Sequence, residues 1–158
     1  MKLIRDRRRT VDLDEFLSRP LFAHLATGSE DGPRESPVWF LWEEGAVWVL
    51  GSRRDDSFPG RVERDARCAI GIVDFRRDEG LVHHVGMRGR GSVERFDPAR
   101  ARRLLARYLG ESDDGWDPRF RATLEDPEGE GAVLIRFDPD TVVARDVSYE
   151  VERRDDGR

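Results

Sequence analysis

Short apolar runs separated by polar turns dominate the hydrophobic pattern of the chain, and the clearest pair lies near its middle. Residues 38–42 and 46–50 are rich in β-branched and aromatic side chains, and the turn between them contains Gly45. Two such runs across a short turn with glycine predict a β-hairpin. The other predicted elements are arranged around this hairpin.

Further strands are predicted on both sides of it. Alternation or a continuous apolar run predicts strands over residues 21–27, 69–75, 81–96, 132–137 and 141–147. The last two are expected to meet at a turn of Asp138, Pro139 and Asp140. Three glycines in residues 81–96 indicate a bend, a bulge or a close backbone approach in that long strand.

Helices are predicted from capping signals. A short helix follows Thr10 or Asp12, either of which can cap it. A longer helix begins at Asp97 and Pro98, the most favourable cap and first-turn residues, and Gly110 ends it. Both helices have apolar residues at helical spacing, so each is expected to cover a core.

A further helix is expected to end near Asp65, with a cap among Asp55, Asp56 and Ser57. Residues 111–131 are predicted to form an acidic loop, and residues 1–9 and 150–158 to be poorly ordered. Six or more strands with two or three helices indicate a mostly β (α+β) fold built on an antiparallel barrel. We expect a single domain over residues 1–158, with its core at about residues 10–149.

Composition narrows the class of protein. The 158 residues are 39% charged and 37% hydrophobic, with a net charge of −5, which is a globular composition. The acidic balance argues against a nucleic-acid partner. The sequence shows neither the apolar core of a secretory signal nor a membrane-length apolar run, so a cytoplasmic location away from membranes is expected.

The residues that follow the hairpin are the main candidates for binding a ligand. Gly51 and Ser52 are followed by Arg53 and Arg54, and then by the start of the helix that ends near Asp65. Small and cationic groups delivered to a helix start suit a phosphate group. The alternative is that the arginines form a solvated face and that Ser57 is only a helix cap.

Other signals predict no chemistry of their own. His83 and His84 are adjacent on a strand and point to opposite faces, so no metal site is expected, although one of them is a candidate to line a ligand groove. Cys68 is the single cysteine, which excludes an internal disulfide, and a packing role is expected for it.

The order of several motifs resembles that of a known family. The motifs are L-F-A-H-L-A-T followed by D-G-P-R, then S-P-V-W-F-L-W, G-S-R-R-D-D-S-F-P-G-R-V, R-D-A-R-C-A-I-G-I-V and V-G-M-R-G-R-G-S-V-E-R-F-D. In this order and spacing, over residues 21–109, the sequence resembles the pyridoxamine 5′-phosphate oxidase-like proteins. These are split β-barrels that bind flavins or deazaflavins.

The resemblance implies a homodimer with flanking helices, and a cofactor in a groove at the subunit interface. FMN is the preferred cofactor and a deazaflavin the alternative. Carried over by position, the cofactor-binding residues are Val38, Trp39, Phe40, Gly51, Ser52, Arg53, Arg54, Ser57, Phe58 and Arg61. The first three border the ring, Gly51 and Ser52 lie beside the ribityl-phosphate, and the rest surround the helix start.

One position departs from the family. Phe58 stands where members often have a basic residue, and losing its charge-assisted hydrogen bond to a phosphate costs about 1.5–3 kcal/mol. Arg53, Arg54 or Arg61 are the candidates to replace that cation.

The function implied is an FMN-binding oxidoreductase acting on a small-molecule substrate that the sequence does not identify. The cofactor carries the redox chemistry in such proteins, so no catalytic residue is named. The alternatives are a deazaflavin-dependent reductase on the same fold, pyridoxamine phosphate oxidation itself, and a non-enzymatic cofactor-binding or interaction protein.

Overall fold

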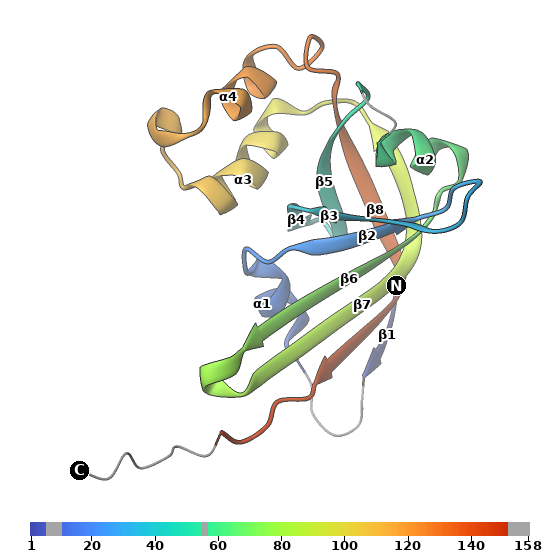
Figure 1. Ribbon diagram of the computed structural model, residues 1–158, viewed down its shortest axis with the longest axis vertical. Coiled ribbons are helices and arrows are strands. Elements are labelled where there is room, and N and C mark those ends of the chain that lie inside the picture. The colour runs from blue at the N-terminus through green and yellow to red at the C-terminus, as the bar shows by residue number, and fades with distance from the viewer. Residues whose placement is uncertain (6–10, 55–56, 152–158) are drawn as a thin grey trace.

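The protein is described by a computed structural model, which covers residues 1–5, 11–54 and 57–151. These residues form one eight-stranded sheet and four α-helices (Figure 1). The strands are β1 (Lys2–Arg5), β2 (Ala23–Thr27), β3 (Arg34–Val38), β4 (Phe40–Glu43), β5 (Ala46–Ser52), β6 (Arg67–Arg76), β7 (Leu81–Glu94) and β8 (Ala132–Asp146). The helices are α1 (Leu13–Ser18), α2 (Phe58–Arg64), α3 (Pro98–Leu109) and α4 (Pro118–Glu125), and 3₁₀ turns occupy Arg77–Glu79 and Asp113–Gly115.

The sheet is antiparallel along its main path, in the order β3-β2-β6-β7-β8-β5-β4. β1 lies off this path and pairs in parallel with the second half of β8. The long strands β7 and β8 occupy the middle, and the sheet curls around them into a half-barrel (Figure 1). The mostly β, antiparallel barrel predicted from the sequence is confirmed.

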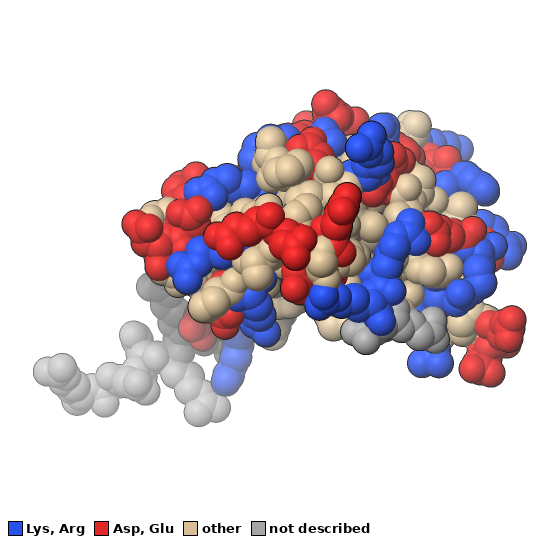
Figure 2. Space-filling model, turned by 90° about the horizontal axis from the view of Figure 1, so that it is seen from above, with Lys and Arg blue, Asp and Glu red and all other residues tan. Residues whose placement is uncertain are grey.

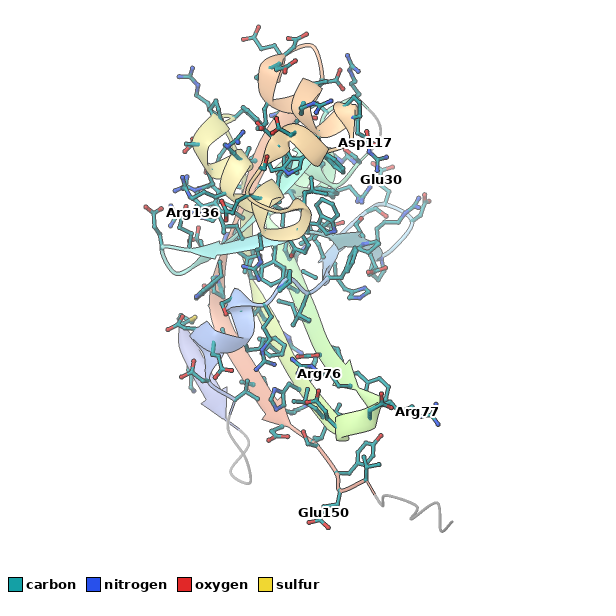
Figure 3. All side chains as sticks on the ribbon, turned by 90° about the vertical axis from the view of Figure 1, so that its left-hand side faces the viewer. Glu30, Arg76, Arg77, Asp117, Arg136 and Glu150 are labelled. Carbon is teal, nitrogen blue, oxygen red and sulfur yellow. The ribbon has the colours of Figure 1, made fainter. Side chains whose placement is uncertain are left out.

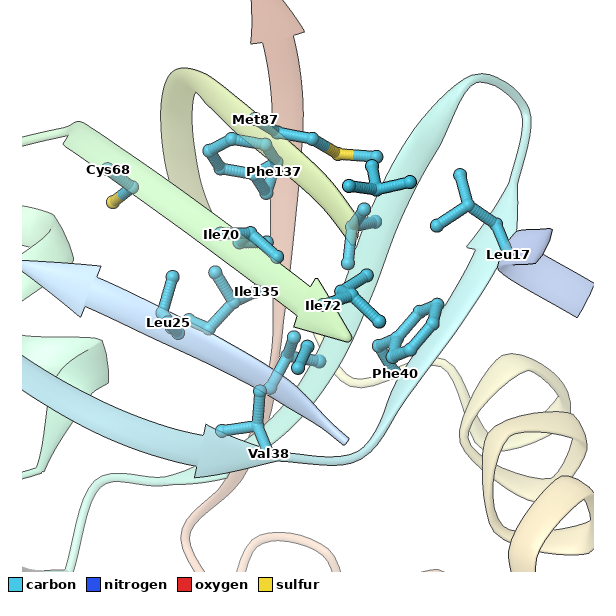
Figure 4. Close-up of a cluster of buried hydrophobic side chains, with 14 of the residues drawn as sticks. Leu17, Leu25, Val38, Phe40, Cys68, Ile70, Ile72, Met87, Ile135 and Phe137 are labelled. Atoms are coloured by element: carbon cyan, nitrogen blue, oxygen red, sulfur yellow. The ribbon is translucent and has the colours of Figure 1, made fainter. Parts of the chain in front are cut away.

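The inside of the curl is the main apolar core. Alternate residues of the long strands point inward, so that Ile70 and Ile72 of β6 lie near Met87 of β7 and Phe137 of β8 (Figure 4). Leu17 of α1 enters the same cluster. Each fully buried aliphatic side chain of this kind contributes about 1.5–3 kcal/mol to folding. This core fixes the positions of the strand ends.

The central hairpin is confirmed. β4 and β5 pair around a two-residue turn in which Glu44 and Gly45 both have positive φ, 57° and 71°, as a tight hairpin turn requires. The run of residues 38–42 is split, however, because Val38 belongs to β3 and pairs with Ala23 of β2. Trp39 separates β3 from β4.

The two closing strands predicted at residues 132–137 and 141–147 are one continuous strand, β8. Pro139 does not turn the chain, because it lies opposite Gly89 at a register shift where Asp140 is the extra residue of a β-bulge. A Cβ on Gly89 would lie 2.1 Å from the Asp138 carbonyl oxygen, so only glycine allows this close approach. Proline is tolerated inside sheets at such bulges.

The predicted acidic loop over residues 111–131 is also wrong, because it contains α4. The helix begins at an Asp-Pro pair, and the Asp117 side chain accepts a hydrogen bond from the backbone N–H of Arg119 at 3.0 Å. The same pair begins α3, where Asp97 caps Ala99 and Arg100 as predicted. The cap signal was therefore present at both sites.

The predictions for the caps of α1 and α2 and for the two ends of the chain are partly confirmed and partly wrong. Asp12 caps α1 through Glu15, whereas Thr10 lies outside the described residues. Ser57 occupies the cap position of α2 without capping it, since its hydroxyl donates to the Ser52 carbonyl, and residues 55–56 are not described. Residues 2–5, expected to lack order, form β1; residues 6–10 and 152–158 lie outside the described part.

Glu43 connects β4 to α3 through two arginines. Its carboxylate accepts from Arg100 Nε at 2.7 Å and from Arg103 Nη2 at 2.9 Å. These contacts, with Arg103 the larger cause, lower the pKa of Glu43. A lowered pKa in the folded state means that the carboxylate contributes stability above its ordinary value of 4.5 and loses it as the pH falls through the lowered value.

Replacing Glu43 with glutamine is therefore expected to lower the free energy of unfolding by about 1 kcal/mol at neutral pH. The difference from the unchanged protein is expected to shrink below pH 4.5. Urea unfolding followed by circular dichroism over a pH series measures both. Glu79→Gln, which removes a 58% exposed partner of Arg76 on a hairpin end, is the control and should change little. A pH-independent difference would contradict the assignment.

Candidate functional site

Trp39, between β3 and β4, is held by aromatic rings of two helices. Its ring stacks on Tyr108 of α3 with centroids 4.7 Å apart and planes 3° apart. It also stacks on Phe120 of α4 at 5.4 Å and 28°. We call Trp39, Tyr108 and Phe120 the aromatic stack. It joins the break in the strand path to both helices.

Tyr108 fixes the stack relative to the barrel. Its hydroxyl donates to the Leu21 carbonyl at 2.7 Å and accepts from the Phe40 backbone N–H at 3.1 Å. Burial raises the pKa of Tyr108, so the hydroxyl keeps the proton that it donates. The start of β4 and the segment before β2 are thus tied to α3, next to the Trp39 ring that stacks on Tyr108.

A largely apolar cavity of about 440 Å³ opens beside the aromatic stack. It lies between the β3 end, the β5 end and the two helices α3 and α4. Its walls are Phe22, Pro37, Val38, Trp39, Leu50, Phe58, Leu104, Leu105, Arg119 and Phe120. The volume falls within the roughly 300–1,000 Å³ of small-molecule sites, and walls of this kind suit a flat ring.

A second cavity, of about 490 Å³, adjoins the first and shares Leu50, Phe58, Arg119 and Phe120 with it. It adds polar groups, and its other lining residues are Gly51, Ser52, Arg54, Thr123, Glu130 and Ala132. We call the two cavities together the groove, with an apolar half and a polar half. An elongated ligand with a flat apolar end and a charged end matches this division.

α4 forms one wall of the groove and is held mainly from its edges. None of the eight described residues of α4 is buried. Phe120 holds it to Trp39, and Arg121 donates to the Asp113 carbonyl at 3.2 Å. Figure 1 shows α4 beside α3, at the end of the barrel where β5 and β8 also lie.

The structure brings six of the ten sequence-predicted residues to the groove. These are Val38, Trp39, Gly51, Ser52, Arg54 and Phe58. They come from the end of β3 and the break after it, from the end of β5 and the turn after it, and from the start of α2, and the fold brings these three places of residues 38–58 together. Their role as cofactor ligands stays a prediction.

The other four lie elsewhere. Phe40 is fully buried in the core, and Ser57 donates its hydroxyl to the Ser52 carbonyl. Arg53 pairs with Glu63 at 2.6 Å on the surface. Arg61 is buried, where its Nε donates to the Thr27 hydroxyl at 2.9 Å and its Nη2 lies 3.3 Å from the Ser36 hydroxyl.

Phe58 fills the place beside Gly51 where the resemblance expects a cation. A Cβ on Gly51 would lie 2.9 Å from both the Phe58 ring and Pro59. The missing side chain of Gly51 therefore lets the aromatic ring pack against the end of β5. This position forms an apolar wall common to the two halves of the groove.

Sequence reasoning missed Arg119 and Phe120, because it treated their segment as a loop. The signal that would have found them is the Asp117-Pro118 pair, followed by a spacing that places Phe120 one turn into a helix. Phe22 was also missed. Leu104 and Leu105 were expected to face the core from the helix that begins at Asp97, but their contribution to a cavity was not predicted.

His83 and His84 point to opposite faces and Cys68 packs in the core, as predicted, but neither histidine lines the groove. His83 faces the inner side near Phe16 and lies 3.7 Å from Asp146, while His84 lines a separate cavity of about 550 Å³ on the outer face of the sheet. Cys68 is buried, and desolvation raises the pKa of its thiol. The described residues contain no group of three or more His, Cys, Asp or Glu side chains placed to hold a metal ion.

The surface around the groove carries charges of both signs. Figure 2 shows Lys and Arg interleaved with Asp and Glu over the end of the molecule that carries α3 and α4. No broad field of one sign lies over this face, so a charged ligand has to be selected by individual side chains. In the described part of the chain, no α-helix has the length and apolar character needed to cross a bilayer.

Comparison with known proteins identifies the fold. No family model and no curated protein matches the sequence. Among solved structures, the protein Rv2991 of Mycobacterium tuberculosis, described as conserved and hypothetical, superposes with a TM-score of 0.70 at 18% identity, covering 96% of this chain and 99% of that one. An F420 reductase superposes with a TM-score of 0.62 at 21% identity, over 85% and 98% of the two chains.

A Listeria innocua protein named for pyridoxamine 5′-phosphate oxidase has a TM-score of 0.53 at 16% identity, over 82% of this chain and 90% of its own. The chain therefore has the split β-barrel fold of the pyridoxamine 5′-phosphate oxidase-like proteins, as the sequence motifs indicated. At such identities the likeness shows the fold alone, and the function has to be argued from the groove.

Proposed function

We propose that the protein is an oxidoreductase that binds a flavin-type cofactor in the groove, with FMN preferred. The observation that carries this proposal is the groove itself, where six residues predicted from separate motifs line two adjoining cavities. One cavity is largely apolar with aromatic walls, and the other adds polar groups that include Arg54 and Arg119. A planar ring joined to an anionic tail has the same division.

The residues present fit such a group. In the apolar half, the Trp39, Phe58 and Phe120 side chains would hold the ring and exclude water from it. In the polar half, Gly51 and Ser52 bring the end of β5 close to the tail, and an arginine would neutralise its charge. A bound flavin would supply hydride transfer to and from a small-molecule substrate.

Serine hydroxyls contribute little donor capacity to the polar half. Ser52 donates to the Glu130 carbonyl at 2.9 Å, and Ser57 donates to the Ser52 carbonyl. A hydroxyl has one proton to donate, so neither has another for an anion without breaking its present bond. Recognition of a charged tail therefore depends on the arginines.

We also propose that the protein acts as a homodimer. Large apolar side chains are exposed on the outer side of the sheet near the β6–β7 hairpin: Val73 (51%), Phe75 (58%), Val147 (56%) and Tyr149 (51%). Exposed groups of this kind mark interaction surfaces. A second copy would cover them, and the resemblance to dimeric split barrels favours that partner. These side chains lie toward the opposite end of the molecule from α4, so this interface differs from the one beside the groove that the resemblance implies.

A deazaflavin is the second candidate, supported by the length of the groove. The polar half continues past Ser52 to Thr123 and Glu130, which leaves room for a tail longer than one phosphate. An F420 reductase shares this fold. The deazaflavin reading uses the same apolar half and differs in what fills the polar half.

The test is an absorbance spectrum of the purified protein, followed by titration with FMN and with F420, a deazaflavin whose anionic tail is longer. FMN binding with a perturbed visible spectrum supports the proposal, and preference for the deazaflavin supports the second candidate. If the protein binds neither, the oxidoreductase proposal is wrong and a cofactor-free interaction protein is favoured. Light scattering at several concentrations tests the homodimer.

A further inference from the structure

Arg119 occupies the point where the two halves of the groove meet. It lines both cavities, together with Leu50, Phe58 and Phe120. Its guanidinium lies over the Phe120 ring, 4.8 Å from the centroid. Because Phe120 stacks on Trp39, the cation is placed at the rim of the apolar half by the same aromatic stack that walls it.

The guanidinium of Arg119 has no close carboxylate partner among the described residues. Within the described part of the chain, the one carboxylate found within 4 Å of it is that of Asp117, at 3.8 Å from Nε, which is beyond hydrogen-bond distance. Its side chain is 75% exposed. An arginine in this setting can turn toward an anion without first losing a hydrogen-bonded partner.

The other arginines near the groove are more strongly held. Arg54 lies 3.3 Å from the Glu130 carboxylate and also donates to the Gly129 carbonyl, so it fastens the loop that leads into β8. Arg53 is paired with Glu63, and Arg61 is directed at Thr27 and Ser36. Binding an anion through Arg54 would have to displace Glu130, which itself lines the polar half.

We infer that Arg119 is the anion-recognition residue of the groove. It would bind the phosphate ester of a ligand whose flat ring lies in the apolar half. The inference rests on the proposed function and deepens it, because it assigns the charge contact to α4 and not to the β5–α2 segment that the sequence motifs indicated. Phe58 leaves that segment without a cation at the expected position, and α4 supplies one from across the groove.

The test compares ligands that differ only in the phosphate. FMN and riboflavin are titrated into the unchanged protein, Arg119→Gln and Arg119→Lys, and the 5-deaza forms of both ligands are titrated in parallel. Removing one exposed charge-assisted contact is expected to weaken FMN binding about tenfold and riboflavin binding less than twofold. Lysine should restore part of the affinity, and added salt should narrow the difference.

A matched control removes an arginine far from the groove. Figure 3 shows Arg77 on the β6–β7 hairpin, at the opposite end of the molecule from Asp117 at the start of α4. Arg77→Gln changes the net charge equally and is expected to leave both affinities unchanged. Circular dichroism is expected to show the same fold for all variants, because both side chains are at the surface.

The outcomes separate the two proposals. If the unchanged protein binds both ligands and Arg119→Gln weakens FMN and riboflavin equally, or neither, the inference about Arg119 is wrong and the cofactor proposal stands. If the unchanged protein binds none of the four ligands, the cofactor proposal fails and the inference fails with it.

Discussion

Replacing Gly89 with alanine is expected to cost the protein roughly 3 kcal/mol or more of its free energy of unfolding. The added Cβ would lie 2.1 Å from the Asp138 carbonyl oxygen and 2.8 Å from the Pro139 Cα, and both are backbone atoms that cannot rotate away. To make room, β7 and β8 have to separate at their bulge. These are the two long strands at the centre of the sheet, so the damage spreads to the core.

Gly71→Ala is the matched control for Gly89→Ala. It is also a glycine in a long strand, but apart from its own chain neighbours no atom would lie within 4 Å of its added Cβ. Alanine restricts the unfolded chain more than glycine does, so this variant is expected to be as stable as the unchanged protein or slightly more stable. Urea unfolding midpoints measure both. Equal midpoints for the two variants would mean that the bulge adapts easily and that glycine is not required.

Replacing Trp39 with alanine is expected to weaken FMN binding about 100-fold. The indole walls the apolar half of the groove and also carries Phe120, so its removal takes away one wall and releases another. Trp39→Phe keeps an aromatic ring in place and is expected to retain most of the affinity. Fluorescence titration with FMN measures both variants.

Trp39→Ala is also expected to have an effect that can be measured without a ligand. Because Phe120 stacks on Trp39 and no described residue of α4 is buried, loss of the indole should loosen α4 selectively. Limited trypsin digestion is expected to cut after Arg119 and Arg121 faster in Trp39→Ala than in Trp39→Phe. Unchanged cutting together with unchanged FMN affinity would show that the stack does not hold the groove.

Local sequence rules predicted most of the strands. They were wrong at residues 138–140, where a contact with a residue far away in the sequence determines the backbone path. Asp138, Pro139 and Asp140 form a strong turn signal when only neighbouring residues are considered. The chain continues straight because Gly89, about fifty positions earlier, leaves space for Pro139 at a bulge. By contrast, α4 was missed even though its Asp-Pro cap is local, because few apolar residues follow the cap.

Only one wall of the groove was predicted from the sequence. The motifs pointed to the ends of β3 and β5 and to the start of α2, and the fold brings those residues to one groove. The opposite wall comes from α4, whose position depends on stacking between Phe120 and Trp39, and no local pattern encodes that contact. Arg61 was a reasonable candidate cation by position, yet the structure directs its guanidinium to two hydroxyls on β2 and β3.

The place of β8 in the sheet has a consequence for biosynthesis. β8 pairs with β1, β5 and β7, and the ribosome makes it after all three. Until residues 132–146 have emerged, the edges of β5 and β7 have no partner and the curl cannot close. From the completion of β7 at residue 94 until β8 emerges, the nascent chain therefore carries two unpaired strand edges, the state in which aggregation competes with folding and chaperones act.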